Sequence, residues 1–191
     1  MIPVKTMNGT REDGPDLTAL PPLKRGTIFL FLEERSSIAY SYLRKLKDRS
    51  AENDATDIDQ PVRNGEFTGL VITRQYPPDL TKDQDLGAIP IYWLTTNLRQ
   101  DQRTISPSAI PRLNLLMNDF IQTPSEGLAI VDCLEYLITQ NSFEAVLRLI
   151  QAWNDKIVGT KKRLLLSVDP LTLTIQQLHL IKKECQELIL Q

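Results

Sequence analysis

The chain has 191 residues, of which 41% are hydrophobic, and its 22 basic and 24 acidic residues leave a formal net charge of −2. That length and apolar content suit one domain with a substantial core. The near balance of charges argues against a general attraction to nucleic acid or anionic lipid, because both depend on a strongly basic surface. We therefore expect neither nucleic acid nor a membrane as a partner.

The two cysteines, Cys133 and Cys185, both lie within apolar patterns. Such positions are typical of reduced, buried thiols in a cytosolic protein rather than of a disulfide framework. The first residues lack the apolar core of a signal peptide, and no apolar stretch approaches the roughly 20 residues that cross a bilayer. A soluble, cytoplasmic protein is the expectation.

Residues 1–25 mix Pro, Gly, Asn and Thr with charges and show no sustained period, which predicts a mobile N-terminal arm. A single domain is expected over 26–191. It begins with a β-rich run at 26–32 and an amphipathic helix at 36–49. Residues 50–66 are acidic and turn-forming, so they are expected to be an inserted polar surface loop.

Strands are predicted at 67–73 and 89–95 from their β-branched and aromatic content. The paired prolines between them allow at most a short helix. A helix is expected over 106–122, with Ser106 as its N-cap and Pro107 at its first position. Its buried face is predicted to comprise Ile110, Leu113, Met117 and Phe120.

Further strands are predicted at 127–132 and 163–168, separated by the most regular amphipathic helix of the chain at 142–159, which Gly159 ends. These strands are apolar at nearly every position, as expected when helices cover both faces of a parallel sheet. The alternation of strands and helices therefore predicts an α/β three-layer sandwich with a mostly parallel sheet.

A last helix is expected from a capping box at Thr174 and Gln177 to about Leu190. Its apolar stripe comprises Leu178, Ile181, Cys185 and Leu188. The stripe suits core packing, whereas the surplus residues Leu180, Ile189 and Leu190 also suit contact with a partner.

Ligands of such sheets bind beyond the carboxyl ends of the strands. The polar residues at those positions are Glu33, Glu34, Arg35, Arg74, Thr95, Thr96, Asp132, Glu135 and Asp169. The candidates for contact with a ligand or partner are Arg74, Thr95, Asp132, Glu135 and Asp169. Asp132 is interpreted either as a turn residue whose carboxylate caps amides or as a polar anchor in a crevice. Arg74 is interpreted as an anion ligand or as the internal partner of Asp132 or Asp79.

Catalytic and metal-binding patterns are absent from the sequence. The segment "LAIVD" resembles the magnesium-binding strand of a P-loop hydrolase, but "EERSSIAYSYLRK" after the first strand has no glycine and two carboxylates that repel an anion. Nothing in the spacing brings His179, the only histidine, to Cys133, and no group has zinc-ligand spacing. We therefore predict no catalytic residues, no metal and no cofactor.

The sequence resembles a microbial family, domain of unknown function 835. The resemblance rests on "GLVITRQYPPDL", "IPIYWLTT" with "TISPSAIPRL", "IVDCLEYLITQNSFEAVLRLIQAWND" and "LLLSVDPLTL", in this order. It implies a fold like that of RecA or KaiC-type ATPases without the phosphate loop, and an occurrence beside sensor and kinase modules in signalling proteins. No activity is implied.

These observations favour a non-catalytic interaction or regulatory module in cytoplasmic signalling, with a protein partner or a second copy of the chain. The alternative is a sensor or enzyme that binds a small anionic or nucleotide-like ligand at the strand ends. Within the N-terminal arm, Leu17, Leu20 and Leu23 beside two prolines are predicted either to dock onto a partner or to pack against the sheet edge.

Overall fold

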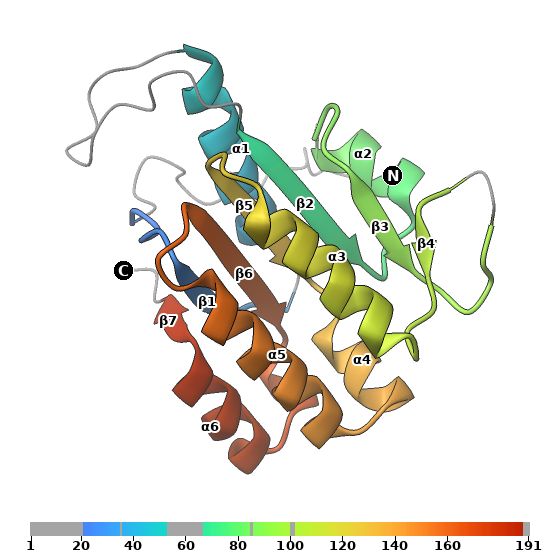
Figure 1. Ribbon diagram of the computed structural model, residues 1–191. Coiled ribbons are helices and arrows are strands. Elements are labelled where there is room, and N and C mark those ends of the chain that lie inside the picture. The colour runs from blue at the N-terminus through green and yellow to red at the C-terminus, as the bar shows by residue number, and fades with distance from the viewer. Residues whose placement is uncertain (1–20, 35, 53–66, 85, 100–101, 189–191) are drawn as a thin grey trace, which may run out of the picture.

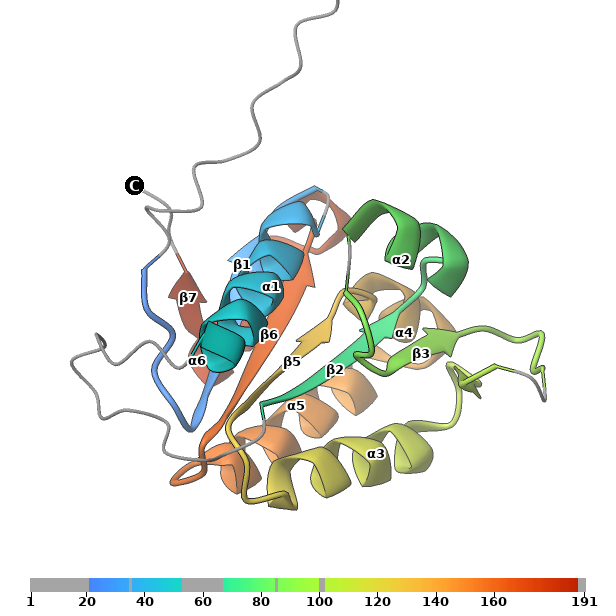
Figure 2. The ribbon, with the colours of Figure 1, turned by 90° about the horizontal axis from the view of Figure 1, so that it is seen from above.

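The computed structural model describes residues 21–34, 36–52, 67–84, 86–99 and 102–188. Within them, seven strands form one sheet in the order β4-β3-β2-β5-β6-β1-β7. Every pair of neighbouring strands is parallel. Helices cover both faces of this sheet, which confirms the predicted three-layer α/β fold (Figure 1; Figure 2).

The strands are β1 (Thr27–Leu32), β2 (Thr68–Thr73), β3 (Ile91–Leu94), β4 (Thr104–Ile105), β5 (Gly127–Val131), β6 (Lys162–Val168) and β7 (Gln186–Leu188). The helices are α1 (Ser37–Glu52), α2 (Pro77–Gln84), α3 (Ile110–Gln122), α4 (Leu134–Gln140), α5 (Phe143–Ile157) and α6 (Ile175–Glu184), with a 3-10 turn η2 (Pro170–Thr172). Both β5 and β6 are buried at every position, which explains the apolar sequence of β5 and the three consecutive leucines, Leu164–Leu166, of β6.

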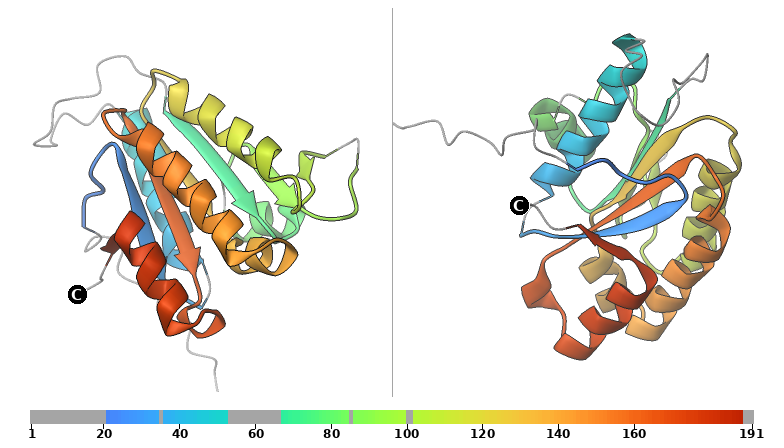
Figure 3. Two further views of the ribbon diagram at one scale, coloured as in Figure 1. Left: turned by 60° about the horizontal axis from the view of Figure 1, so that its bottom comes forward. Right: turned by 90° about the vertical axis from the view of Figure 1, so that its left-hand side faces the viewer.

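Two cores hold the layers together. Helices α3, α4, α5 and α6 pack on one face of the sheet, and α1 and α2 pack on the other (Figure 3). Trp153 of α5 is completely buried in the first core and Tyr40 of α1 is buried in the second. None of the described helices has the combination of length and apolarity that a membrane crossing requires. Both cysteines are free; Cys133 is buried and Cys185 is half-buried.

The start of α3 differs from its prediction. The helix begins at Ile110, three residues later than expected, and Ala109 occupies the N-cap position. The hydroxyl of Ser106 instead forms a hydrogen bond with that of Ser108 in the preceding turn. Pro111 takes the place in the first turn that we expected for Pro107. Pro107 and Pro111 are both compatible with the first turn of a helix, and the periodicity of the apolar residues does not choose between them.

The C-terminal helix is shorter than predicted. The capping box at Thr174 and Gln177 is confirmed, but α6 ends at Glu184 and the chain turns into β7. Leu188 is therefore buried as a strand residue beside β1, not as part of a helical stripe. The open edge of β1 provides backbone partners that a continued helix would leave unpaired. Strand β4 and helix α4 were not predicted.

The last residues of the predicted arm belong to the fold. Leu23 is 6% exposed within the second core, and its carbonyl accepts a hydrogen bond of 2.5 Å from Arg163 Nε. Pro21 O accepts one of 3.0 Å from the Tyr42 hydroxyl. Leu23 is thus unavailable for docking and packs against the sheet, while Leu17 and Leu20 lie outside the described residues. Of the predicted loop 50–66, the first three residues continue α1 and the rest is likewise not described.

A buried group of charges lies at the amino end of the sheet. Glu126 Oε1 accepts a hydrogen bond of 2.6 Å from Arg163 Nη1, and the Glu126 carboxylate accepts two of 3.1 Å from Arg25. Burial opposes ionisation, but the hydrogen bonds and charges of the two arginines outweigh it and lower the pKa of Glu126. We call Arg25, Glu126 and Arg163 the Glu126 cluster; it fastens the described start of the chain to β6.

Candidate functional site

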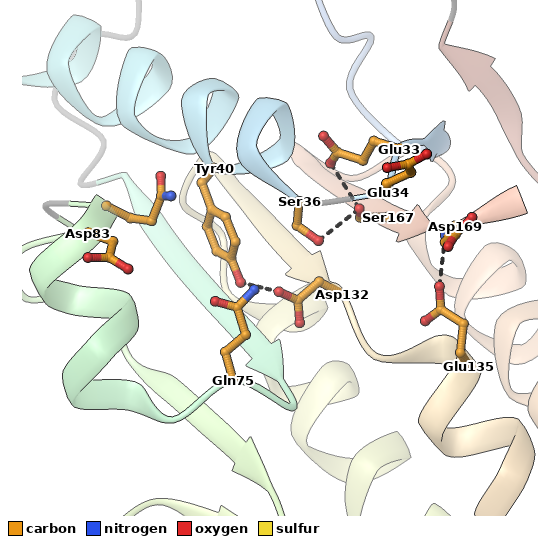
Figure 4. A pocket seen from close by; sticks show the side chains of 11 residues that line it. Glu33, Glu34, Ser36, Tyr40, Gln75, Asp83, Asp132, Glu135, Ser167 and Asp169 are labelled. Carbon is orange, nitrogen blue, oxygen red and sulfur yellow. Dashed lines mark hydrogen bonds between the residues drawn. The ribbon is translucent and has the colours of Figure 1, made fainter. Parts of the chain in front are cut away.

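A cavity of about 530 Å³ opens at the carboxyl ends of β1, β2, β5 and β6 (Figure 4). Its lining comes from the loops that follow these four strands, from the end of β6 and from helices α1, α2 and α4, as expected where the strand order of an open parallel sheet changes direction. The lining residues are Glu33, Glu34, Ser36, Tyr40, Gln75, Asp83, Gln84, Asp132, Glu135, Ser167 and Asp169. We call this cavity the acidic cleft.

The acidic cleft presents hydrogen-bond acceptors and negative charge. Six of its eleven lining residues are Asp or Glu, and none is Lys, Arg or His. None of the six carboxylates forms an ion pair with another residue that the structure describes. Like charges lining one concave surface reinforce each other's potential. The cleft is therefore suited to a cationic group and repels an anion.

Glu33 caps the N-terminus of α1, a feature that would otherwise attract a phosphate. Its carboxylate accepts hydrogen bonds from the amides of Ile38 (3.1 Å) and Ala39 (3.4 Å) and from the Ser167 hydroxyl (2.9 Å). Free amides at a helix start are an anion site in many nucleotide-binding proteins. Here the chain supplies its own anion, so a phosphate would have to displace Glu33.

Asp132 is paired with a phenol. The Tyr40 hydroxyl of α1 donates a short hydrogen bond to Asp132 Oδ2. Asp132 Oδ1 has almost no accessible surface and forms no hydrogen bond of ordinary geometry with a described group, although part of the residue borders the cleft. The Thr73 side chain and the residue's own amide add weaker hydrogen bonding to the carboxylate. Burial is the largest influence on this carboxyl group and raises its pKa to about 6. Among the described residues Asp132 forms no ion pair with Arg74, contrary to one of our expectations; its side-chain partner Tyr40 lies on a helix 92 positions earlier.

Arg74 does not reach the acidic cleft. Its Nη1 donates a 3.2 Å hydrogen bond to Leu94 O, and its guanidinium carbon lies 4.8 Å from the centre of the Tyr136 ring and 6.0 Å from that of Trp93. Among the described residues it forms no ion pair with Asp132 or with Asp79. Contact with two aromatic rings therefore takes the place of the internal ion pair, which was one of the two alternatives that the sequence left open.

Thr95 also lies outside the cleft lining. It is 3% exposed, and its hydroxyl accepts a 3.1 Å hydrogen bond from the amide of Asn97, which is a local turn contact. Glu135 and Asp169 do line the cleft with Asp132. Glu135 Oε1 accepts a 2.8 Å hydrogen bond from the Asp169 amide, so the start of α4 is joined to the end of β6.

The sequence analysis missed several lining residues, namely Ser36, Tyr40, Gln75, Asp83, Gln84 and Ser167. Ser167 could have been recognised from the sequence, because it is a hydroxyl residue within the otherwise apolar end of β6. Tyr40 carried none, because its position depends on how α1 packs across β5.

No activated nucleophile is evident at the cleft. Cys133 is adjacent but buried, and burial raises the pKa of its thiol well above the ordinary value. His179 is exposed on α6. Within the described ranges, no group of three or more His, Cys, Asp or Glu side chains is arranged to hold a metal ion.

We expect Asp132→Asn to stabilise the protein above pH 6. The carboxyl pKa is 3.8 ordinarily and about 6 in the fold, so the folded state binds the proton more tightly between these values. The free energy of unfolding therefore falls as pH rises from 4 to 6 and stays lower above. The amide keeps an acceptor for Tyr40 without the charge, and we expect a gain of about 1–2 kcal/mol at pH 8, discounted for partial exposure.

Urea denaturation of both proteins at pH 4 and pH 8 measures this effect. The control is Asp83→Asn, which removes an exposed carboxylate at the rim and should change stability by less than about 0.5 kcal/mol. A loss of stability at pH 8 in Asp132→Asn would show that the ionised carboxylate supports the fold.

The fold defines a protein of the parallel three-layer α/β class. The family model for a protein of unknown function, DUF835, matches residues 40–185, which is more than half of the chain, and the chain belongs to that family. The match includes Tyr40, Asp132 and Asp169 of the cleft, while Glu33 and Ser36 precede it.

One solved structure with the same fold comes from a structural study of a Pyrococcus horikoshii OT3 protein. The similarity covers 87% of this chain and 84% of that one, with a TM-score of 0.51 and 12% sequence identity. At this identity the similarity extends to the fold alone. Comparison with curated proteins found no significant match.

Proposed function

We propose that the protein is a non-catalytic interaction module that binds a basic segment of a partner protein in the acidic cleft. The observation that carries the proposal is the lining of the cleft by the described residues: six carboxylates, with hydroxyls and amides, and among these residues no basic side chain. A partner that brings a cation into this cleft gains attraction from several carboxylates at once. Electrostatic complementarity of this kind accelerates association and selects against acidic partners.

The alternative, a small anionic or nucleotide-like ligand, has less support. It relied on Arg74 and Asp132 acting together, but Arg74 is stacked between aromatic rings outside the cleft lining. The amides at the start of α1 already hold Glu33. A nucleotide would meet six carboxylates without a neutralising side chain in the lining.

The setting that we propose is cytoplasmic regulation or signalling, in keeping with the resemblance noted from the sequence. We also propose that the fold is related to that of RecA or KaiC-type ATPases, with Glu33 standing where a phosphate-binding loop would bring its ligand. Under this proposal, the strand-end surface binds an anionic ligand in the ATPases and a cationic one in this protein.

Fluorescence anisotropy with labelled octalysine and octaglutamate tests the proposed function. We expect octalysine to bind and octaglutamate not to bind. The double variant Glu34→Gln with Asp83→Asn should weaken octalysine binding about tenfold, which is ~1.4 kcal/mol.

The matched control is Asp119→Asn with Asp155→Asn, which removes the same charge from α3 and α5, on the opposite layer. Equal weakening by both double variants would mean that net charge, not the cleft, attracts the peptide. A thermal shift with ATP and Mg²⁺ that exceeds the shift with octalysine would favour the nucleotide alternative.

A further inference from the structure

The residue that follows β2 holds a positive charge at a fixed place on the surface. Arg74 is exposed, yet its Nη1 donates a 3.2 Å hydrogen bond to Leu94 O of β3. Its guanidinium carbon lies over the Tyr136 ring of α4, 4.8 Å from the ring centre. The Arg74 carbonyl in turn accepts a 3.0 Å hydrogen bond from Trp93 Nε1. Backbone and side chain are both held, so a ligand would find this arginine already ordered.

The loop that carries Arg74 is also fixed on its far side. The Gln75 amide donates a 2.9 Å hydrogen bond to Thr73 Oγ1, and two prolines begin α2 directly after Tyr76. Proline locks one backbone torsion, which limits the conformations of the loop. The position of Arg74 therefore follows from the end of β2 and the start of α2.

The guanidinium group of Arg74 has donors to spare and no counter-charge. It forms no ion pair with a described carboxylate, and among the described residues only Leu94 O accepts a hydrogen bond from it. A guanidinium presents five N–H donors in one plane. A ring against its face leaves the edge open, where paired donors match the two oxygens of a carboxylate. Of the two roles that the sequence leaves open for Arg74, contact with an external anion is the one that remains.

Aromatic side chains flank this cation on the surface. Tyr76 is 37% exposed, and its ring meets that of Trp93 edge-on with 5.2 Å between the ring centres. The Arg74 guanidinium carbon lies 6.0 Å from the centre of the Trp93 ring. Arginine, tyrosine and tryptophan are the residues that most often carry the binding energy of protein interfaces. We call Arg74, Tyr76, Trp93 and Tyr136 the arginine–aromatic patch.

The surroundings of the patch select among anions. Gln75 and Glu135, the sequence neighbours of Arg74 and Tyr136, both line the acidic cleft. The six carboxylates of the cleft repel a nearby anion in proportion to its charge. A nucleic-acid strand carries a charge on every phosphate and is opposed more strongly than a single carboxylate. The patch therefore suits one acidic side chain with an aromatic neighbour.

We propose that the arginine–aromatic patch binds an acidic residue of a partner protein, with Arg74 pairing with the carboxylate and Tyr76 packing against an aromatic residue next to it. This second binding site lies outside the acidic cleft and has the opposite charge preference. It does not depend on the proposed function, because none of its contacts involves a carboxylate of the cleft.

NMR of the tryptophan indole N–H groups measures this contact directly. The chain has two tryptophans; Trp153 is completely buried, whereas Trp93 Nε1 is bonded to the Arg74 carbonyl. The probe is the capped dipeptide glutamyl-phenylalanine, and glutaminyl-phenylalanine is its uncharged counterpart. We expect the first to shift the Trp93 signal saturably while the Trp153 signal stays in place. The second should need at least about tenfold more peptide for the same shift, because it lacks the charge.

Variants assign the contact to Arg74. Arg74→Gln should weaken binding of the glutamyl peptide at least about tenfold and leave that of the glutaminyl peptide unchanged. Arg74→Lys keeps the charge but not the paired donors, so it should recover only part of the affinity. Arg148→Gln is the matched control, because it removes the same charge from an exposed position on α5 and should change neither affinity. An unchanged Trp153 signal in each variant shows that the core around it is intact.

Three results would overturn the proposal. If both peptides shift the Trp93 signal at equal concentration, the carboxylate is not recognised. If Arg148→Gln weakens binding as much as Arg74→Gln does, net charge and not the patch attracts the peptide. If a single-stranded oligothymidylate shifts the signal at lower concentration than the glutamyl peptide, the patch serves nucleic acid instead. None of these measurements uses a basic peptide, so the octalysine test of the proposed function succeeds or fails separately.

Discussion

Replacement of Glu126 by alanine is expected to cost about 3–5 kcal/mol of stability, because it leaves Arg163 buried without its counter-charge. Arg163 and Glu126 are 8% and 9% exposed, and the bond between them is 2.6 Å long. Two arginines would remain in a site designed for one carboxylate. The loss should appear as a lower urea midpoint with an unchanged slope, since the extent of unfolding is the same.

A surface ion pair provides the matched control for this prediction. Lys182 and Glu187 are 2.9 Å apart but about one-third exposed, so Glu187→Ala should cost no more than about 1 kcal/mol. The pKa of Glu126 is lowered in the fold, so its contribution is present above the ordinary value of 4.5 and is lost as pH falls through the lower folded value. Equal costs for the two alanine variants at pH 7 would show that the Glu126 cluster is too hydrated to matter.

Replacement of Tyr40 by phenylalanine is expected to cost about 1–3 kcal/mol at pH 8, because the ionised Asp132 carboxylate then loses its phenol donor. The loss should also raise the pKa of Asp132 further above 6, since burial would act with less opposition from hydrogen bonding. The cost should therefore shrink near pH 4, where the carboxyl group is protonated and needs the donor less.

Tyr42 supplies the control, because it lies on the same helix and donates to a neutral acceptor, Pro21 O, at 3.0 Å. Tyr42→Phe should cost about 0.5–1.5 kcal/mol with no dependence on pH between 4 and 8. In a double-mutant cycle, Tyr40→Phe should cost less in the Asp132→Asn background than alone. Additive costs would mean that the phenol and the carboxylate do not interact.

The central part of the fold is predictable from the sequence because burial on both faces leaves an unmistakable pattern. Strand β5 and the leucines in the middle of β6 are apolar runs, and the stripe of α5 ends where Gly159 takes a positive φ of 79°. The end of α6 was not predictable in this way. Apolar residues near Leu188 fit a helix period and a strand equally, and the choice between them depends on the free edge of β1, which is a tertiary effect.

The candidate site, like the fold, is only partly predictable from the sequence. The rule that ligands bind at strand carboxyl ends selects Asp132, Glu135 and Asp169 correctly as neighbours in one cleft. It selects Arg74 equally, but the direction of that side chain is decided by the aromatic rings of Trp93 and Tyr136. Contacts between a helix and a distant strand end have no signature in local spacing.

The outermost strands of the described sheet are very short. β4 has two residues and β7 has three, whereas the strands between them have four to seven. A neighbouring molecule that tried to extend the sheet would find few backbone groups to pair with, and short edge strands are one way in which native proteins resist such growth. Extension of the sheet by a neighbouring molecule is therefore expected to be weak at both described edges.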